Sequence, residues 1–447
     1  MQTRVIRRAL QVTVLGGVFM VLQAVNAGAM IQGITGTSFN LTATTGHIST
    51  PDSGSYLIWG YANGAGLAQY PGPTIIVNEG DQVQVKLTNS LTVAGAGPAP
   101  NVSIVFPGQH VVVSPTDSGI PGILANEAAP GGTVTYQFTA AKPGTYTYYS
   151  GTDSALQVEM GLIGAMIVRP ASGANYAYNH PDTQFDRETL FLLSEMDPRI
   201  HQVVETFGPD AVAATGYLAN YFPVLWFING RAAPDTMADN GVPWLPNQPY
   251  NCMPMMNPGD RLLMRVIGGG RDMHPFHFHG NHARVIARDG RLLESTLGAG
   301  PDLSYELFTI QSQPGSTVDA IFGWTGQGLG WDIYGSPAEG PEYAHECMDM
   351  DNDDFDDMTH EYCPDHYKPF PVTLPGSLEL TFGGFYSGSP FLGLVQSLPP
   401  GEGGMNPNGG YTYMWHSHTE KEMVNYDIFP GGMMTMLIIE APGVMIH

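Results

Sequence analysis

The chain has 447 residues and a formal net charge of −24, because 17 Lys and Arg stand against 41 Asp and Glu. This balance argues against a nucleic-acid-binding protein, whose phosphate contacts require clustered basic side chains. The length allows two or three domains with full-sized cores, and the 56 Gly and 36 Pro are typical of short strands joined by turns.

The N-terminal segment 1–29 is predicted to be a secretory signal peptide. Arg4, Arg7 and Arg8 precede an apolar run over 9–25, and Ala27-Gly-Ala29 offers small residues for cleavage. A membrane anchor is the alternative interpretation. No later stretch approaches the ~20 apolar residues that span a bilayer. We therefore expect a mature chain that is exported, periplasmic or extracellular, and without a membrane span.

The rest of the chain is predicted to be all-β. Over 30–170, short alternating runs such as 74–77, 82–87 and 134–138 are separated by turn residues, which indicates a β-sandwich. A polar segment over 171–187 is expected to link it to a second sandwich over 188–442. Long irregular insertions are expected in this second sandwich near 197–221 and 326–410, the latter acidic from about 335. Such long loops are usually functional or disordered.

Five of the 14 histidines fall in two short motifs, HPFHFHG over 274–280 and WHSH over 415–418. Residues two apart on a strand share a face, so His277 pairs with His279, and His416 with His418. If these strands are neighbours, four imidazoles converge on one pocket. His274 would face the opposite way on a regular strand. Imidazole suits copper, zinc, iron and nickel, and the two clusters favour a metal site over isolated structural histidines.

These motifs resemble the third and fourth copper motifs of the multicopper oxidase family. Further segments are similar to other parts of the family, in the family's order: YPGPTI over 70–75, EGDQV over 79–83, GTYTYYSG over 144–151, GLIGAMIV over 161–168, FINGR over 227–231 and NPGDR over 257–261. The resemblance implies cupredoxin-like Greek-key sandwiches, two rather than three, with copper as the cofactor. It also implies His274, His277, His279, His416 and His418 as metal ligands. Small two-domain laccases place a copper site between the subunits of a trimer, so a homotrimer is a further prediction.

The departures from the family pattern concern the remaining copper ligands. Four histidines of the first two motifs are replaced, by Val105, Pro107, Tyr149 and Gly151. The resemblance therefore implies a trinuclear copper site with half of its ligands missing.

The mononuclear, electron-accepting copper of the family also lacks ligands here. Its cysteine corresponds to Ser417, and a hydroxyl cannot replace a thiolate at a blue-copper centre. Its second histidine falls near Glu422, while His274 is retained and Met433 or Met434 could supply the axial ligand. We expect the electron entry route of the family to be broken.

The acidic insertion has three competing interpretations. Cys347 and Cys363 flank it and could pair, since export permits disulfides, which leaves Cys252 as a buried free thiol. Alternating Asp349, Asp351 and Asp353 could hold calcium. Soft thioethers prefer Cu(I), and the candidate ligands are Met348, Met350, Met358, His345 and His360. The third interpretation is a solvated loop held by the disulfide.

Three functions remain open from the sequence. The first is an exported copper-binding protein with an incomplete trinuclear site and no blue-copper cysteine. The second is an atypical copper-dependent oxidoreductase acting on phenols or metal ions, with Tyr148 or Tyr149 as a redox partner. The third is a structural or surface protein in which the histidines bind nothing. The same four nitrogens also suit zinc, so the identity of the metal is open, as is whether the protein is an enzyme.

Overall fold

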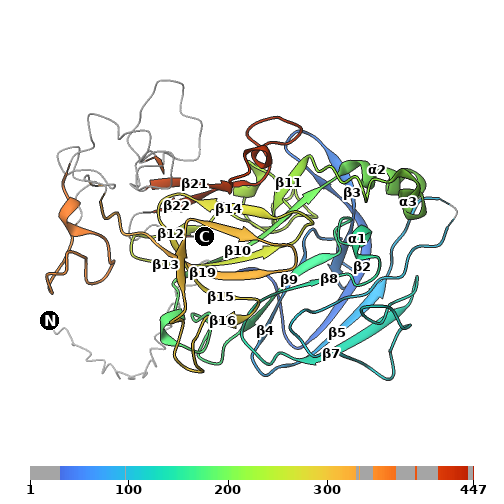
Figure 1. Cartoon of the computed structure of the whole chain (residues 1–447), viewed down its shortest axis with the longest axis horizontal. Helices are drawn as coiled ribbons and strands as arrows, with labels where there is room; N and C mark the ends of the chain where they lie inside the picture. Colours follow the sequence, from blue (N-terminus) through green and yellow to red (C-terminus); the bar gives the residue numbers. More distant parts are fainter. Residues whose placement is uncertain are drawn as a thin grey trace, which may run out of the picture.

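The structure is a computed structural model that describes residues 31–95, 97–328, 332, 346–368, 388–389, 411–440 and 446. The expected signal peptide lies outside these residues. Two β-sandwiches lie side by side, the first coloured blue to teal and the second green to red in Figure 1. The all-β fold class is confirmed. No helix in the described part of the chain is long and apolar enough to cross a membrane.

The first sandwich consists of two sheets with the strand orders β1-β4-β9-β8 and β3-β2-β5-β7-β6. The strand bounds are β1 Ile34–Thr35, β2 Ser38–Ser49, β3 Ser55–Asn63, β4 Gly72–Asn78, β5 Gln82–Asn89, β6 Val112–Val113, β7 Thr133–Thr139, β8 Gly144–Tyr149 and β9 Ile163–Arg169. Alternation along β5 buries Val83, Val85 and Leu87 while Gln82 and Gln84 face solvent. This period of two is the pattern of a strand with one buried face.

The second sandwich has the orders β11-β10-β13-β19-β15-β16 and β12-β22-β21-β14-β18, with β17 on β15 and β20 on β21. The bounds are β10 Arg187–Met196, β11 Leu225–Ile228, β12 Met255–Met256, β13 Arg261–Gly268, β14 His274–Phe278, β15 Ala283–Arg288, β16 Arg291–Leu292, β17 Tyr305–Leu307, β18 Thr309–Ser312, β19 Thr317–Gly323, β20 Gly388–Ser389, β21 Tyr411–Ser417 and β22 Met434–Ile439. Its core is aromatic: Phe276 and Phe278 of β14 pack with Phe191 and Trp415. The tight packing of these rings holds β14 against β21.

One expected irregular insertion, 197–221, is largely helical. It contains α2 Pro198–Phe207, η2 Pro209–Ala211 and α3 Val212–Thr215. The prediction was wrong because it overlooked a helix start: the Asp197 carboxylate accepts the Arg199 amide and a proline occupies the first turn. Ile200 and Val204, four residues apart, lie on the buried face of α2. The other short helices are α1 Ser154–Gln157, η1 Pro181–Thr183, η3 Asp235–Met237, η5 Cys363–Asp365 and η6 Glu420–Met423.

A buried charge network ties the two sandwiches together. Arg265 of β13 is fully buried and donates to Glu188 of β10 (3.0 Å) and to the Thr145 hydroxyl of β8 (2.9 Å). Thr145 in turn donates to Asp319 of β19 (2.5 Å). Burial raises the pKa of Glu188, but the guanidinium groups of Arg265 and Arg169 outweigh burial and lower it. Buried charges persist in proteins when they are paired in this way, so β8 is held in a defined position against the second sandwich.

Candidate metal centre

The two histidine motifs lie on neighbouring antiparallel strands. In the pairing of β14 with β21, His277 is opposite His416, Phe276 is opposite Ser417 and Phe278 is opposite Trp415. Because side chains alternate along each strand, the aromatic residues face the core, and His277, His279, His416 and His418 share the other face. The sequence expectation of converging imidazoles depended on this pairing, which the structure shows.

Four imidazoles lie together on this face. The ring centroid of His277 is 4.9 Å from that of His279, 5.4 Å from His416 and 4.8 Å from His418. The Nε2 atoms of His416 and His279 are 3.3 Å apart. Nitrogen atoms of His277, His279 and His416 all lie within 4.8 Å of one another, so a single ion could contact all three after small side-chain adjustments. We call His277, His279, His416 and His418 the four-histidine cluster.

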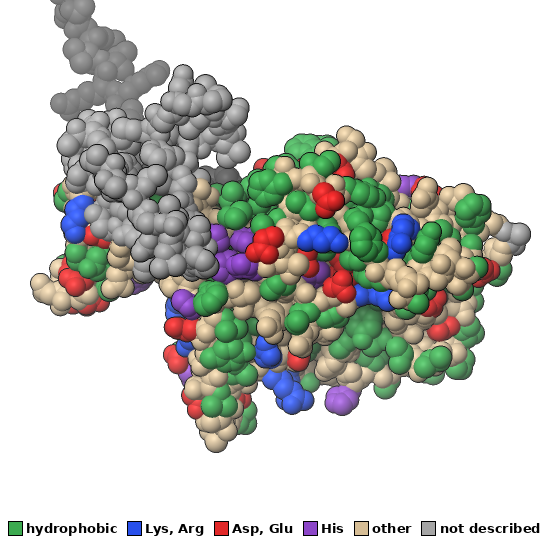
Figure 2. Space-filling model, turned by 45° about the horizontal axis from the view of Figure 1, so that its top comes forward, with side chains coloured by type: hydrophobic (Ala, Val, Ile, Leu, Met, Phe, Trp, Pro, Cys, Tyr) green, Lys and Arg blue, Asp and Glu red, His purple; other side chains and the backbone are tan. Residues whose placement is uncertain are grey.

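The cluster is buried on one side and open on the other. His277, His416 and His279 are 2%, 5% and 7% exposed, whereas the side chain of His418 is 45% exposed and contacts Glu420 (2.9 Å). Figure 2 shows a patch of histidine side chains at the molecular surface. An ion would therefore reach the buried imidazoles past His418.

Hydrogen bonds set which ring nitrogen is available in two of these imidazoles. His277 Nδ1 lies 2.8 Å from the Phe308 carbonyl, and His416 Nδ1 lies 2.8 Å from the Ser417 carbonyl. A carbonyl only accepts, so each Nδ1 carries the proton and each Nε2 holds a lone pair. His277 Nε2 is buried and has no hydrogen-bond partner among the described residues. A buried lone pair without a partner is costly, and a metal ion would satisfy it.

The electrostatics favour the neutral form of two imidazoles in the cluster, His277 and His416. Burial is the largest cause that lowers the pKa of His277 to about 4, and the three neighbouring imidazoles contribute to the same lowering. Burial likewise lowers the pKa of His416 to about 4, despite its bond to the Ser417 carbonyl. Both rings are unprotonated at neutral pH and have their lone pairs free to bind a cation.

His274 lies on the opposite, core-facing side of β14, and the structure does not bring it to the cluster. Its Nε2 is 2.8 Å from Glu195 and its Nδ1 is 2.9 Å from Glu422, and all three side chains are buried. Ser417 donates to the same Glu422 oxygen (2.5 Å). Burial alone would lower the pKa of His274, but the two carboxylates outweigh it and raise the pKa to about 9. His274 is therefore an imidazolium with both nitrogens engaged.

Further buried polar groups extend from this imidazolium. Glu195 Oε1 accepts the backbone amides of Arg271 (2.5 Å) and Asp272 (3.0 Å), and the Tyr221 hydroxyl donates to Glu159 (2.7 Å) while lying 3.4 Å from Glu195. Sequence reasoning missed Glu195 and its neighbours. The available signal was a carboxylate at the end of the apolar run LFLLSEM over 190–196, since Glu is rarely buried without a partner.

The other residues compared with the family's copper ligands lie in other surroundings. Val105 and Tyr149 form a backbone bridge within the first sandwich. Tyr148 packs against Tyr61 and Phe106 and donates to the Pro73 carbonyl (2.7 Å), so it is a core residue of that sandwich. Neither contact places a tyrosine in the four-histidine cluster. Met433, the candidate axial ligand, is buried in the aromatic core of the second sandwich.

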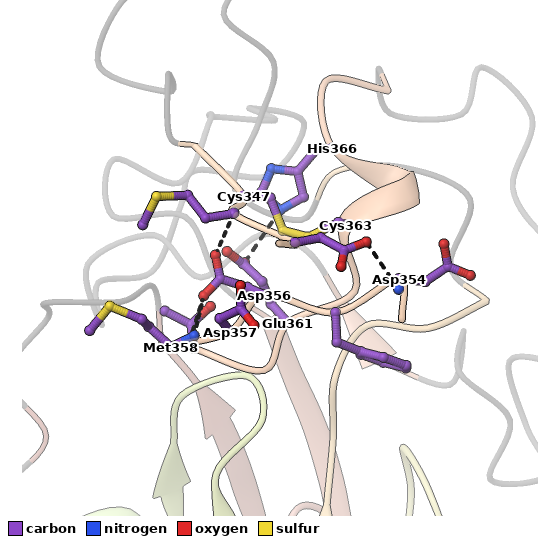
Figure 3. The surroundings of a disulfide bond; sticks show 12 residues. Cys347, Asp354, Asp356, Asp357, Met358, Glu361, Cys363 and His366 are labelled. Atoms are coloured by element: carbon purple, nitrogen blue, oxygen red, sulfur yellow. Dashed lines mark hydrogen bonds and ion pairs between the residues drawn. A yellow bond between two sulfur atoms is a disulfide. The ribbon is translucent and has the colours of Figure 1, made fainter. Parts of the chain in front are cut away.

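The acidic insertion is organised around a disulfide. Cys347 and Cys363 are bonded, with a Cα–Cα distance of 5.6 Å (Figure 3), which confirms the expected pairing, and Cys252 is a buried free thiol. Asp356 accepts the amides of Met348, Met358 and Thr359. Although burial alone would raise its pKa, these bonds lower it to about 2. This internal hydrogen bonding accounts for the loop conformation without an ion.

The alternative ligand sets of this insertion are only partly described. Asp349, Asp351 and Asp353 have carboxylate oxygens close enough to share an ion, although Asp349 already accepts the amides of Asp353 and Asp354. Among the thioether candidates, Met350 and Met358 are each 77% exposed. His345 lies outside the described residues. The calcium and Cu(I) interpretations of this loop stay predictions.

The fold and the four-histidine cluster together define a two-sandwich β protein with an imidazole site suited to a metal ion. Residues 46–173 match the multicopper oxidase family model, so the chain contains a domain of that family, and the resemblance inferred from its motifs is confirmed. This match covers most of the first sandwich.

Curated relatives agree with this family, and a solved structure shares the fold. The L-ascorbate oxidase of Brassica rapa subsp. pekinensis is 35% identical over 127 residues, which cover 28% of this chain and 20% of the relative. The iron transport multicopper oxidase FET3 of Saccharomyces cerevisiae is 34% identical over 147 residues, 31% of this chain and 21% of the relative. The matches thus span about a fifth of each relative. The blue copper oxidase of Nitrosomonas europaea is 18% identical, with a TM-score of 0.53 over 90% of this chain and 86% of that chain, which shows the shared fold.

Proposed function

We propose that this chain is an exported copper-binding protein on a multicopper oxidase scaffold, with an incomplete trinuclear site and without a blue-copper centre. The observation that carries the proposal is the buried, unpartnered Nε2 of His277, facing three further imidazoles. These groups fit a metal ion, because the two strands hold them in position and two are kept unprotonated by burial.

Copper is the ion proposed for this site. Imidazole nitrogens bind both copper and zinc, but the divalent affinity order of such sites peaks at Cu²⁺. The names of the similar proteins include a blue copper oxidase and a multicopper oxidase. When bound, copper would supply a redox-active or Lewis-acid centre held by His277, His279, His416 and His418.

The same proposal excludes the four-electron oxygen chemistry of the family. Ser417 offers no thiolate, and His274 is already bonded by Glu195 and Glu422. The described cysteines do not substitute, since Cys347 and Cys363 are paired and the Cys252 thiol donates to the Thr236 carbonyl (3.1 Å). Electrons therefore have no thiolate route into the cluster.

Copper content of two variants tests this proposal. The double change His277→Ala with His416→Ala removes one donor from each strand, and we expect copper bound per chain to fall sharply. His47→Ala is the matched control, because His47 is an exposed imidazole paired with Glu205 elsewhere on the surface. Full copper retention in the double variant, measured by elemental analysis alongside zinc, would place the metal elsewhere and contradict the proposal.

A second candidate function is supported by the exposure of His418. A site open to solvent on one side could admit a small reductant, as an atypical copper-dependent oxidoreductase requires. Oxygen consumption by the copper-loaded protein with a phenol, Cu(I), Fe(II) or Mn(II) separates this candidate from simple binding. Turnover that disappears in the double histidine variant would favour the enzyme.

Two further parts of the proposal concern the protein as a whole. Export rests on the basic and apolar pattern of residues 1–29, and N-terminal sequencing of the mature protein tests it. The homotrimer rests on the resemblance to small two-domain laccases, and light scattering of the purified protein gives the oligomeric state directly.

A further inference from the structure

A second site lies between the two sandwiches, outside the four-histidine cluster. A cleft of about 810 Å³ is enclosed by three turns, at 107–110 of the first sandwich and at 288–291 and 314–317 of the second. Its lining includes the basic side chains Lys142, Arg288 and Arg291, with His110 beside them. Arg288 ends strand β15 and Arg291 begins strand β16, and both line the cleft together with residues of the first sandwich. The volume lies in the range of small-molecule pockets.

The two arginines form an unfavourable pair in the absence of an anion. Arg288 and Arg291 are directly opposite each other across the β15–β16 hairpin, and like charges at such positions repel each other. The hairpin turn between them, Asp289-Gly290, has positive φ at both residues (49° and 68°), as a two-residue turn of this kind requires. The tight turn therefore places the two arginines on adjacent strands, and both side chains line the cleft.

These cations also lack the carboxylate partners that six other described basic residues have. Arg169, Arg187, Arg199, Arg261, Arg265 and Lys368 all form ion pairs with carboxylates. Within the described ranges, Arg288, Arg291 and Lys142 have no ion pair, although Asp and Glu outnumber Lys and Arg by 41 to 17. Asp289 is the nearby acidic residue of the lining, and its Oδ1 accepts the Thr317 amide (2.9 Å). The cleft is thus a local concentration of unneutralised positive charge.

The floor of the cleft is held in position by Tyr146. A Cβ added to Gly290 would lie 2.4 Å from its ring, and a Cβ added to Gly108 would lie 2.9 Å from it. The tyrosine ring therefore packs directly beneath turns from both sandwiches, and its hydroxyl donates to the Lys142 carbonyl (3.1 Å). The adjacent Thr145 belongs to the buried network with Arg265 and Asp319. Basic groups on a fixed frame favour anion binding, since little ordering entropy is lost on association.

We propose that this cleft binds a small organic polyanion that carries at least two carboxylate or phosphate groups. Arg288 and Arg291 contact one anionic group through their planar guanidinium donors, as arginine does with both carboxylates and phosphates. Lys142 of the first sandwich contacts a second group from the opposite wall. The separation of the cations on two walls, and the cleft volume, favour a ligand with two or more anionic groups over a monovalent anion.

Calorimetric titration of the full-length mature protein tests the proposal with three probes at low salt. Pyrophosphate and succinate represent the phosphate and carboxylate sources, and acetate is the monovalent control. We expect at least one multivalent probe to bind more tightly than acetate, with weaker binding at high ionic strength because of screening. Arg288→Ala with Arg291→Ala should weaken that binding by about tenfold or more. Arg288→Lys with Arg291→Lys should weaken it less, because the charge is kept.

Arg284→Ala is the matched control. It removes the same charge from the same strand, but Arg284 donates to the Asp182 carbonyl outside the cleft, so binding should be unchanged. Circular dichroism establishes that each variant is folded. The proposal is overturned if no multivalent probe binds more tightly than acetate, or if Arg284→Ala weakens binding as much as the double variant. Unchanged binding in the folded double variant would also overturn it and would indicate chelation of protein-bound metal.

Discussion

The two faces of β14 hold the same side chain in opposite states. His277 faces the four-histidine cluster, is unprotonated, and has a ring nitrogen without a hydrogen-bond partner among the described residues. His274, three residues earlier, faces the core and is a doubly bonded imidazolium. Both are buried, so burial does not separate them. Their different charge states come from their neighbours, because imidazoles surround the His277 ring and carboxylates surround the His274 ring.

This difference bears on where the proposed metal ion would bind. The cluster presents lone pairs, whereas the core face contains a cation in the form of His274. Glu195 and Glu422 carry the compensating negative charge. The proposed metal ion would therefore bind at the first face, whereas the second face already holds the protonated His274.

The largest expected effect comes from removing the imidazolium. His274→Ala leaves Glu195 and Glu422 buried without their cation, and we expect a loss of about 3–5 kcal/mol in the free energy of unfolding. In metal-free protein, His277→Ala should cost less, because it removes only bonds to the Phe308 carbonyl and the Thr309 hydroxyl. Urea unfolding measures both. Equal losses in the two variants would remove the distinction between the faces.

The pH dependence of stability should differ in sign between the faces. The folded pKa of His274 is raised to about 9 from 6.5. Its contribution, on the order of 3 kcal/mol, is therefore fully present below pH 6.5 and is lost as the pH rises through 9. Burial lowers the folded pKa of His277 and His416 to about 4, so their contribution is present above pH 6.5 and is lost as the pH falls through 4.

Unfolding of metal-free protein between pH 4 and pH 10 measures this dependence (an interval chosen to cross both pKa ranges). His274→Ala should remove the alkaline loss, and His277→Ala should reduce the acidic one. A variant that alters the opposite limb of the profile would contradict the assignment of the two charge states.

Copper should stabilise the protein through the cluster alone. At a free copper concentration about 100 times Kd, we expect the free energy of unfolding to rise by about 2.7 kcal/mol. The gain should persist in Glu422→Gln, which changes only the core face, and disappear in the His277→Ala, His416→Ala double variant. Loss of the gain in Glu422→Gln would mean that the core face takes part in metal binding.

The smallest expected effect is that of Ser417→Cys. The new thiol would lie beside Glu422, and a nearby carboxylate disfavours the thiolate that a blue-copper centre requires. We expect unchanged copper content and no intense blue absorption. Blue colour in this single variant, recorded by visible spectroscopy, would show that copper displaces the His274 carboxylate bonds.

Much of the candidate site follows from local pattern. The spacing of two in HFH and HSH, on strands with aromatic residues between, predicts a shared imidazole face, and the same parity predicts that His274 faces away. Two partners of His274 could not be predicted, since Glu195 is 79 residues and Glu422 is 148 residues distant in sequence. From the sequence, Glu422 was identified only as the residue near the position of a family histidine, and its contact with His274 was not predicted. The helix α2 was missed although its capping residues are local.

The sequence by itself determines which side chains are present and on which face of a strand each one lies. It gives four imidazoles in two pairs, no cysteine at 417, and strands that alternate in burial. Only the tertiary structure decided which charged groups meet. Packing of β10 and η6 against β14 places two carboxylates on His274, and the pairing of β15 with β16 places Arg288 opposite Arg291. The reason is physical, because a pKa or an ion pair depends on distances of a few ångströms between residues that the chain order leaves far apart.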